Sequence, residues 1–226
     1  PLTPGNAVLP LPDGDLAYDT MLGAIDGATR SVTLLTYIFD DDRAGARFVT
    51  ALRQAQARGV AVRVLVDAVG ARYSRPTIIA RLEEAGVPAA TFLPTRVPWR
   101  FPYANLRNHR KILVVDGRVG FTGGMNIREG HQPSLAPASP VRCLHFRLDG
   151  PVVRDMQQVF ADDWYFATGE LLPDDDTWYA SGESCGPVAA RGVSDGPDNE
   201  LGVMPTVLFG ALAAATHRVS LITPYF

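Results

Sequence analysis

Three apolar runs of strand length alternate with three amphipathic segments of helix length over the first 92 residues, and this alternation constrains the fold more than any other feature of the sequence. The expected elements are a helix at 17–28, a strand at 31–38, a helix at 44–58, a strand at 60–66, a helix at 77–85 and a strand at 87–92. Gly59 and Gly86 follow the second and third helices, where glycine commonly ends a helix. Strands and helices that alternate in this way predict an α/β architecture with parallel strands.

The pattern changes after residue 92. Two short strand-like runs, 111–115 and 118–122, flank the pair Asp116-Gly117, and an Asp-Gly pair in that setting is the strongest short-range signal for a β-hairpin. A further strand is expected near 142–148 and a helix from about 152 to 166. Because a hairpin adds antiparallel strands, we predict an α/β fold with a mixed central β-sheet that is flanked by helices on both faces.

The sequence also contains an internal repeat. Residues 24–36 (AIDGATRSVTLLT) align without gaps with residues 211–223 (ALAAATHRVSLIT), an offset of 187 residues, from 24 to 211. We interpret this as the opening of a second copy of the domain; chance similarity between two helix-to-strand junctions is the alternative. The expected organisation is a catalytic half at 1–172, a linker or long loop at 173–200, and the start of a second, truncated half at 201–226.

Composition limits the partners and the environment that we expect. The 226 residues include 21 Lys and Arg against 24 Asp and Glu, a net charge of −3, so the chain has no overall basic character for binding nucleic acid. Cys143 and Cys185 are too few for a disulfide framework, and we expect free thiols. The longest apolar stretch, 201–216, is too short and too interrupted to span a bilayer. The first residue is Pro1 rather than methionine, which suggests a processed or excised form and leaves targeting open.

One cluster of polar residues has a composition and spacing that suit a reactive site. Side chains alternate between the two faces of a strand, so His109 and Lys111 are expected to project to the same side. The hairpin turn then returns the chain beside them and brings Gly123, Gly124 and Asn126 close to the histidine. The glycines let the backbone approach a ligand, and Asn126 adds an amide donor.

An imidazole, a cation, an amide and nearby backbone N–H groups together suit phosphoryl chemistry, because they supply a nucleophile or proton carrier and hold positive charge where phosphate oxygens gather negative charge. The pattern indicates a site for an anion and not for a metal. A lone histidine beside an arginine is more often a surface residue, however, and a lysine at the start of a strand is usually solvated. Asp116 is most simply the first residue of the tight turn.

The spacing of these residues resembles a known signature. His109-x-Lys111-x4-Asp116-x6-Gly123-Gly124-x-Asn126 matches the HKD motif of the phospholipase D superfamily. The run Tyr37-Ile38-Phe39, the text around the motif, and the segment from Gly150-Pro151 to Trp164 are similar to bacterial cardiolipin synthases in particular. The resemblance implies a phospholipase D-like fold built from two pseudo-repeats, of which this chain is the N-terminal half.

The same resemblance implies a mechanism. His109, Lys111 and Asp116 would be the catalytic residues, and Lys111, Asn126, Gly123 and Gly124 would bind the substrate phosphate. One histidine attacks phosphorus and forms a phosphohistidine, while the histidine of the other half exchanges protons with the alcohols; which of these roles falls to His109 is open. Neither a metal nor another cofactor is expected. A phosphatidyl group would pass between glycerophospholipids such as phosphatidylglycerol, at the bacterial cytoplasmic membrane to which the protein would bind peripherally.

Two positions depart from the family pattern. An acidic residue that orients the histidine commonly occupies the position of Cys143, and a thiol is a poor substitute because it is a weak acceptor. A glutamate is often found near the position of Leu35. Either change suits weakened activity, a different substrate, or a degenerate half that serves as a lipid-binding or structural module.

The runner-up is a hydrolytic relative, either a phospholipase D or a phosphodiesterase that acts on nucleic acid. The net negative charge argues against nucleic acid as a partner. A local basic and aromatic cluster is interpreted as a lip that contacts headgroups or the membrane, although a nucleic-acid groove has the same composition. Its members are Arg96, Arg100, Arg107, Arg110, Trp99, Phe101 and Tyr103. The second catalytic histidine is expected from a downstream motif or from a homodimer partner.

Overall fold

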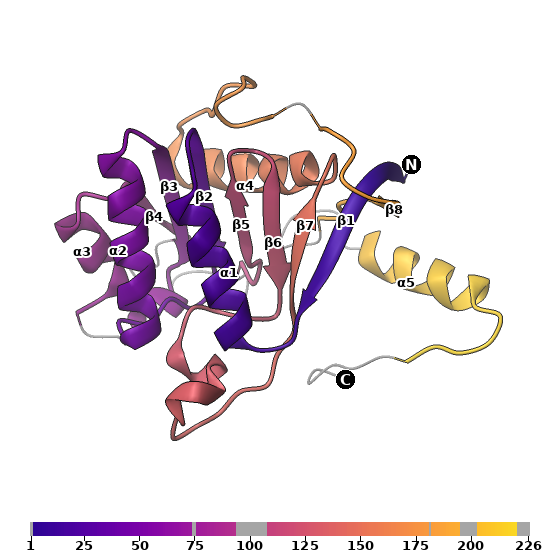
Figure 1. Cartoon of the computed structure of the whole chain (residues 1–226), viewed down its shortest axis with the longest axis horizontal. Coiled ribbons are helices and arrows are strands. Elements are labelled where there is room, and N and C mark those ends of the chain that lie inside the picture. The colour runs from indigo at the N-terminus through magenta and orange to yellow at the C-terminus, as the bar shows by residue number, and fades with distance from the viewer. Residues whose placement is uncertain (1, 74–75, 94–107, 181, 195–202, 221–226) are drawn as a thin grey trace. The chain divides into compact units, whose positions relative to one another are not determined.

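The computed structural model describes residues 2–73, 76–93, 108–180, 182–194 and 203–220, and it divides the chain into two compact units, Pro1–Gly192 and Val193–Phe226. The first unit contains an eight-stranded sheet with the strand order β4-β3-β2-β5-β6-β7-β1-β8 (Figure 1). The strands are β1 (Thr3–Leu11), β2 (Ser31–Thr36), β3 (Ala61–Asp67), β4 (Ala89–Phe92), β5 (Ile112–Val115), β6 (Val119–Gly123), β7 (His145–Asp149) and β8 (Val188–Ala190).

The sheet is mixed, as the sequence predicts. Strands β2, β3 and β4 run parallel to one another, and from β5 onward each strand is antiparallel to its neighbours. The change of direction falls between β2 and β5, which are paired antiparallel. It brings the carboxyl end of β2 next to the start of β5, so that Tyr37 and Lys111 lie at the same edge of the sheet.

Helices cover both faces of the sheet (Figure 1). Buried residues of three helices share one hydrophobic core with alternate residues of β2 and β5, and a fourth helix packs on the opposite face. The helices of the first core are α1 (Gly14–Asp26), α2 (Arg43–Ala57) and α3 (Ile78–Glu84), and the helix of the second core is α4 (Val153–Thr168). Leu113 faces the first core and Ile112 the second, as strand alternation requires.

The hairpin between β5 and β6 turns where predicted. Asp116 and Gly117 both have positive φ, 53° and 63°, and the Arg118 N–H donates to the Val115 carbonyl oxygen (3.0 Å). This tight turn leaves residues 116–118 between the paired Val115 and Val119. Asp116 also accepts bonds from the backbone that leads into β2, from the N–H groups of Thr29, Arg30 and Ser31. The turn therefore anchors the start of β2 as well as joining two strands.

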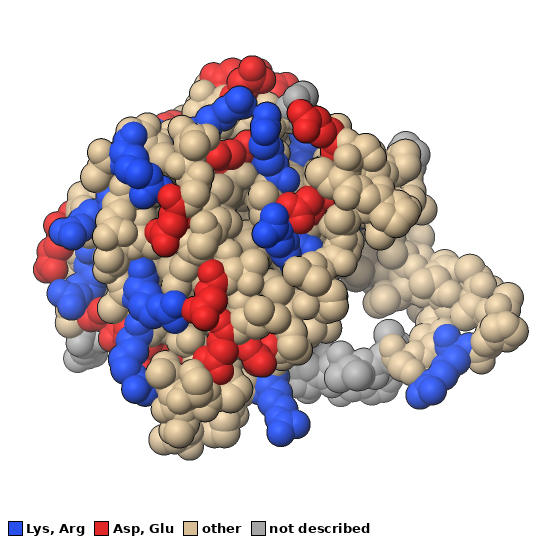
Figure 2. All heavy atoms as spheres, viewed as in Figure 1, with Lys and Arg blue, Asp and Glu red and all other residues tan. Residues whose placement is uncertain are grey.

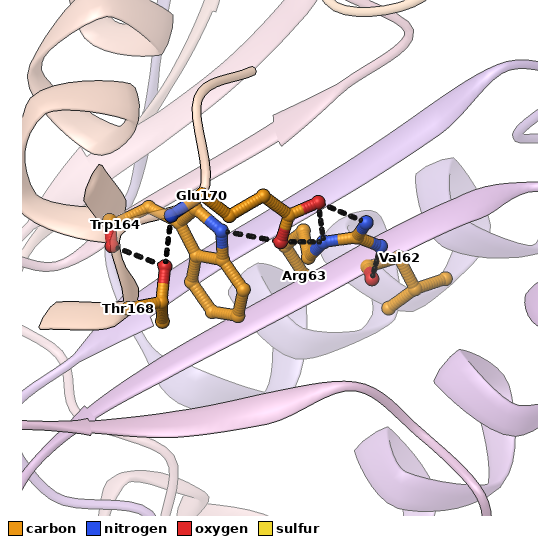
Figure 3. Close-up of polar contacts among 5 residues, drawn as sticks. All are labelled: Val62, Arg63, Trp164, Thr168 and Glu170. Carbon is orange, nitrogen blue, oxygen red and sulfur yellow. Dashed lines mark hydrogen bonds and ion pairs between the residues drawn. The ribbon is translucent and has the colours of Figure 1, made fainter.

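Residues 173–192, most of the stretch expected to be a linker or long loop, lie within the first unit. Trp178 is 5% exposed, and β8 pairs with β1. Figure 3 shows how the chain after α4 is fastened: Glu170 forms an ion pair with Arg63 of β3 (N···O 2.5 Å) and accepts a bond from Trp164 Nε1 (2.9 Å). The Arg63 guanidinium also lies 5.8 Å from the Trp164 ring and 5.7 Å from the Trp178 ring, within the range of cation–π attraction.

The second unit contains the helix α5 (Val203–Ala214), which has no buried residue. The strand expected from the repeat falls mostly on 221–226, outside the described residues. Among the helices that the structure describes, none combines the length and the apolar character needed to cross a bilayer.

Candidate functional site

His109 and Lys111 meet on the ring of Tyr37, the residue that follows β2. The imidazole of His109 stacks on this ring, with 4.1 Å between the ring centroids and 28° between the planes. The Lys111 Nζ lies 5.5 Å from the centroid of the same ring and donates a 2.6 Å bond to the carbonyl oxygen of His109. The two side chains of the motif therefore share one side of the chain, as the alternation argument predicts.

Arg110, which lies between them, and Asn108, which precedes them, point the other way and hold the segment in place. Arg110 forms an ion pair with Asp163 of α4, with both oxygens 2.8 Å from Nη1, and the two side chains are 15% and 12% exposed. Asn108, 1% exposed, donates its amide to Asp163 (2.8 Å) and its backbone N–H to Asp67 at the end of β3 (3.1 Å). These contacts fix the segment on the sheet and leave His109 and Lys111 facing away from α4.

Asn126 joins the same edge through its side-chain oxygen, which accepts the N–H of Ile38 (3.0 Å). The buried hydroxyl of Tyr18 donates to the Asn126 carbonyl oxygen (2.6 Å) and fixes the loop from the other side. A backbone bridge between Phe39 and Ile127 continues the connection. Because the oxygen of the Asn126 amide is engaged by the backbone, its amino group is the end turned away from Ile38 and suited to an anion.

Burial shifts the titration of both motif residues. It lowers the pKa of the Lys111 amine to about 8, against smaller opposing effects of Cys143 and Asp67. It also lowers the pKa of the His109 imidazole, as does the nearby Lys111, while the Asp67 carboxylate acts in the opposite direction. At neutral pH the imidazole is accordingly neutral and the amine is largely protonated, so an uncharged ring nitrogen and a cation lie side by side.

The two glycines of the motif serve close packing. Gly123 has a φ of 149°, and a Cβ there would lie 2.7 Å from the Cα and 2.8 Å from the Nδ1 of His145. A Cβ on Gly124 would overlap the sulfur of Cys143. The N–H of Gly124 donates to the Leu144 carbonyl (3.0 Å). This N–H is thus engaged in the sheet, and the glycines act by letting β6 approach the segment that leads into β7.

The fold does not bring Asp116 close to His109 and Lys111. It lies at the opposite end of β5, five residues beyond Lys111, and at about 3.3 Å per residue this is roughly 16 Å. Its carboxylate is engaged by the backbone at 29–31 and by the Thr29 hydroxyl (2.9 Å). Its predicted role in catalysis is therefore replaced by the turn-and-anchor role that its position at the Asp-Gly pair allowed.

The two departures from the family pattern occupy different environments. Cys143, a free half-buried thiol, contacts the hydrophobic core and lies near enough to influence Lys111. Among the described residues, none makes a hydrogen bond to a ring nitrogen of His109. Leu35 is fully buried in the core beneath α4. Cys185 is also a free thiol and is exposed.

Most of the predicted basic and aromatic cluster, Arg96 to Arg107, lies outside the described residues. Its remaining member, Arg110, is not a surface contact, because it is paired with Asp163. Sequence reasoning also missed Asn108, Asp67 and Asp163 as supports of the motif. The alternation that placed His109 and Lys111 together could have placed 108 and 110 on the buried side. In the part of the chain that the structure describes, no three His, Cys, Asp or Glu side chains form a group suited to a metal ion.

Solved structures share this fold. A phospholipase D family member, Nuc from Salmonella typhimurium, matches 73% of this chain and 97% of its own with a TM-score of 0.54 and 22% identity. Phosphatidylserine synthase from Haemophilus influenzae Rd KW20 matches 70% of this chain and 36% of its own, with a TM-score of 0.54 and 14% identity. At these identities the likeness concerns the fold alone, which is phospholipase D-like.

Comparison of the sequence with family models assigns the chain to one family with this fold. Residues 21–135 match the family described as cardiolipin synthase, PLD-like domain. The match spans half of the chain and includes both Tyr37 and the complete His-x-Lys motif. The chain therefore belongs to the cardiolipin synthase family of phospholipase D-like domains, which confirms the resemblance found in the sequence.

Curated relatives agree. The chain is 35% identical over 230 residues to cardiolipin synthase A of Pseudomonas fluorescens (strain Pf-5), a match that covers 100% of this chain and 47% of the relative. It is 33% identical over 219 residues to a cardiolipin synthase of Geobacillus sp. (strain WCH70), covering 96% and 43%. The chain thus spans about half the length of the curated relatives that it matches.

Proposed function

We propose that the protein is a phosphatidyltransferase of the cardiolipin synthase type, which moves a phosphatidyl group between glycerophospholipids through a phosphohistidine intermediate. The observation that supports this most is the juxtaposition of a neutral imidazole and a half-buried amine on one ring, His109 and Lys111 on Tyr37, beside Asn126. Identity to cardiolipin synthases over the whole chain supports the substrate class.

In the first step an imidazole nitrogen of His109 attacks the phosphorus of the donor phosphodiester. The new N–P bond replaces the P–O bond to the leaving alcohol, whose oxygen takes a proton from a second acid. In the second step the acceptor hydroxyl loses its proton to that group and attacks phosphorus, and the N–P bond breaks. The lowered pKa of His109 favours the attacking role over the proton-donating one, because attack requires a neutral ring.

Lys111 and Asn126 bind the phosphate oxygens in this proposal. The Lys111 amine is charged at neutral pH, since its pKa is about 8, and its burial strengthens its attraction for an anion. The amino group of Asn126 is presented by the bond between its oxygen and Ile38. Gly123 and Gly124 supply close packing beneath this loop.

A second half would supply the second acid, either from further sequence or from another copy of the chain. Two observations support a downstream half. The relatives are about twice as long as this chain. The helix α5 ends at Ala214, and the repeat offset of 187 residues maps this position to residue 27, one beyond the end of α1 at Asp26.

Observable features distinguish two other candidate functions from phosphatidyl transfer. Hydrolysis of nucleic acid would favour an extended basic surface, whereas Figure 2 shows acidic and basic side chains interspersed over the visible face. A degenerate lipid-binding half draws on Cys143 and Leu35, the two departures from the family pattern. We place the enzyme at the surface of the bacterial cytoplasmic membrane, where its lipid substrates are found.

The test is incubation of the full-length protein and of its His109→Ala variant with phosphatidylglycerol vesicles, followed by mass spectrometry of the lipids. We expect cardiolipin and glycerol from the wild type and neither from the variant. Phosphatidic acid as the main product would assign the protein to hydrolysis instead. Equal cardiolipin formation by both proteins would overturn the proposal.

A further inference from the structure

Tyr37 is a residue of the site to which neither the motif nor the mechanism assigns a task. It follows directly after β2, is half-buried, and contacts both reactive side chains: the imidazole of His109 by stacking and the amine of Lys111 by a cation–π contact. Stacking restricts the tilt of the imidazole, and the π face of the ring attracts the ammonium group. One ring thus constrains both groups.

The backbone that bears the ring is held from two sides. The N–H of Ile38 donates to the Asn126 side chain (3.0 Å), and the Ile38 carbonyl accepts from Ile127 N–H (3.0 Å) and from the Thr36 hydroxyl (3.0 Å). On the other side the Tyr37 carbonyl packs so closely on Gly70 that a Cβ at residue 70 would overlap it. The ring is therefore mounted on a fixed backbone and can orient what stacks on it.

The histidine needs such a support. In the described part of the chain no hydrogen bond orients the ring nitrogens of His109. An imidazole that rotates about its side-chain torsions would present its nitrogen to phosphorus only part of the time. We propose that Tyr37 is a positioning residue that holds the His109 imidazole in its attacking orientation by ring stacking. This inference rests on the proposed phosphatidyl transfer.

The proposal assigns the positioning role to the ring of Tyr37 and not to its hydroxyl, and two variants distinguish these groups. Tyr37→Phe keeps the stacking ring, while Tyr37→Leu removes it and leaves an apolar side chain. We expect kcat of the full-length protein with phosphatidylglycerol to fall by about 10- to 100-fold in Tyr37→Leu, with KM within about twofold, because misorientation affects the attack and not the binding of lipid. In Tyr37→Phe we expect kcat within about threefold of the wild type. Tyr165→Leu, which removes a 50% exposed tyrosine from α4, is the matched control.

Thermal unfolding of each variant checks that it folds, and Tyr37→Met replaces Tyr37→Leu if the latter unfolds below the assay temperature. Wild-type kcat in the variant without a ring would overturn the proposal. So would a Tyr37→Phe variant as slow as Tyr37→Leu, or a change confined to KM, since these would assign the effect to the hydroxyl or to lipid binding. His109→Ala in the same series distinguishes a failure of the proposed function from a failure of the role of Tyr37. Activity without His109 would overturn the proposed function. An inactive His109→Ala variant beside a fully active Tyr37→Leu variant would overturn the role of Tyr37 alone.

Discussion

The signature residues at the two ends of the β5–β6 hairpin have different roles. At the open end, His109 and Lys111 lie against Tyr37, and their side chains make few bonds within the protein. At the turn end, the Asp116 carboxylate is engaged by the backbone of three consecutive residues. One sequence motif therefore combines two residues that we propose to take part in the reaction with a residue that holds the fold together.

The comparison teaches that spacing in a motif does not imply a shared site. Lys111 and Asp116 stand at a fixed interval because the four residues of β5 separate them, and β5 must be long enough to pair with β2 on one side and β6 on the other. Variants at the open end should therefore reduce activity, and variants at the turn or on the buried side should reduce stability.

The largest effect is expected at His109. His109→Ala should lower the rate of lipid transfer by on the order of 1,000-fold or more, because it removes the attacking atom. The side chain is exposed, so the free energy of unfolding should change by less than about 1 kcal/mol. Transfer kinetics and urea unfolding check both parts, and His217→Ala, which removes an exposed histidine from the second unit, is the control.

Lys111→Met should reduce the rate by about 100- to 1,000-fold, because a half-buried charge proposed to stabilise the phosphate oxygens is lost. In the wild type the rate should fall as pH rises above about 8, since burial lowers the pKa of this amine and only its protonated form is a cation. Lys111→Arg should retain its charge across this range. A decline near pH 8 that persists in Lys111→Arg would assign it to another group.

Arg110→Met tests the buried side of the same segment. It leaves the Asp163 carboxylate without its ion-pair partner, and breaking a buried pair in this way costs about 3 kcal/mol of stability. Chemical unfolding measures the loss. The double variant Arg110→Met/Asp163→Asn should recover part of it, because the uncompensated charge is then removed. Equal stability of Arg110→Met and wild type would contradict the anchoring role.

Asp116→Asn tests the turn end, and asparagine tolerates the positive φ of this position. The loss of hydrogen bonds to a charged acceptor should cost about 2 kcal/mol of stability while the rate per folded molecule stays within about threefold. Burial opposes ionisation of Asp116, but bonds from the backbone of Arg30, Thr29 and Ser31 lower its pKa below the ordinary value. The stabilisation is thus present above about pH 4 and lost as pH falls through the folded-state pKa. Unfolding at several pH values should show the two proteins converging in acid.

The smallest effect is expected at Gly124. A Cβ there would overlap the sulfur of Cys143, so Gly124→Ala should cost about 1 kcal/mol through crowding. Removing the sulfur in Gly124→Ala/Cys143→Ala should restore most of this loss, as measured by thermal unfolding. A double variant no more stable than Gly124→Ala would show that the glycine is needed for a reason other than this contact.

Much of the fold could be predicted because its signals are local. The alternation of segments up to residue 92 and the Asp116-Gly117 turn depend on neighbours in sequence, and both predict elements that the structure contains. Strands β1 and β8 were missed because Pro4, Gly5 and Pro10 interrupt the strand pattern of β1, and each strand is defined by a distant partner. The segment from Glu170 onward has a loop-like composition, and the contacts of Glu170 and Trp178 with Arg63 of β3 show that it is packed.

The site was predictable in part for the same reason. Two-residue alternation placed His109 with Lys111, and the hairpin returned Asn126 toward them. The stacking of Tyr37 on His109 joins elements that are far apart in the chain, and it depends on the β2–β5 pairing, which the sequence alone does not define. The engagement of Asp116 by residues 29–31 depends on the same pairing.

The central claim is that a ring nitrogen of His109 is the nucleophile that bonds to phosphorus. The most direct test is rapid denaturation of the full-length protein during turnover of phosphatidylglycerol labelled in its phosphate, followed by peptide mapping under alkaline conditions, in which a phosphohistidine is stable. The label is expected on the peptide that contains His109, and it should be absent from the His109→Ala variant. An active wild-type enzyme whose label is found only on another histidine would contradict the claim.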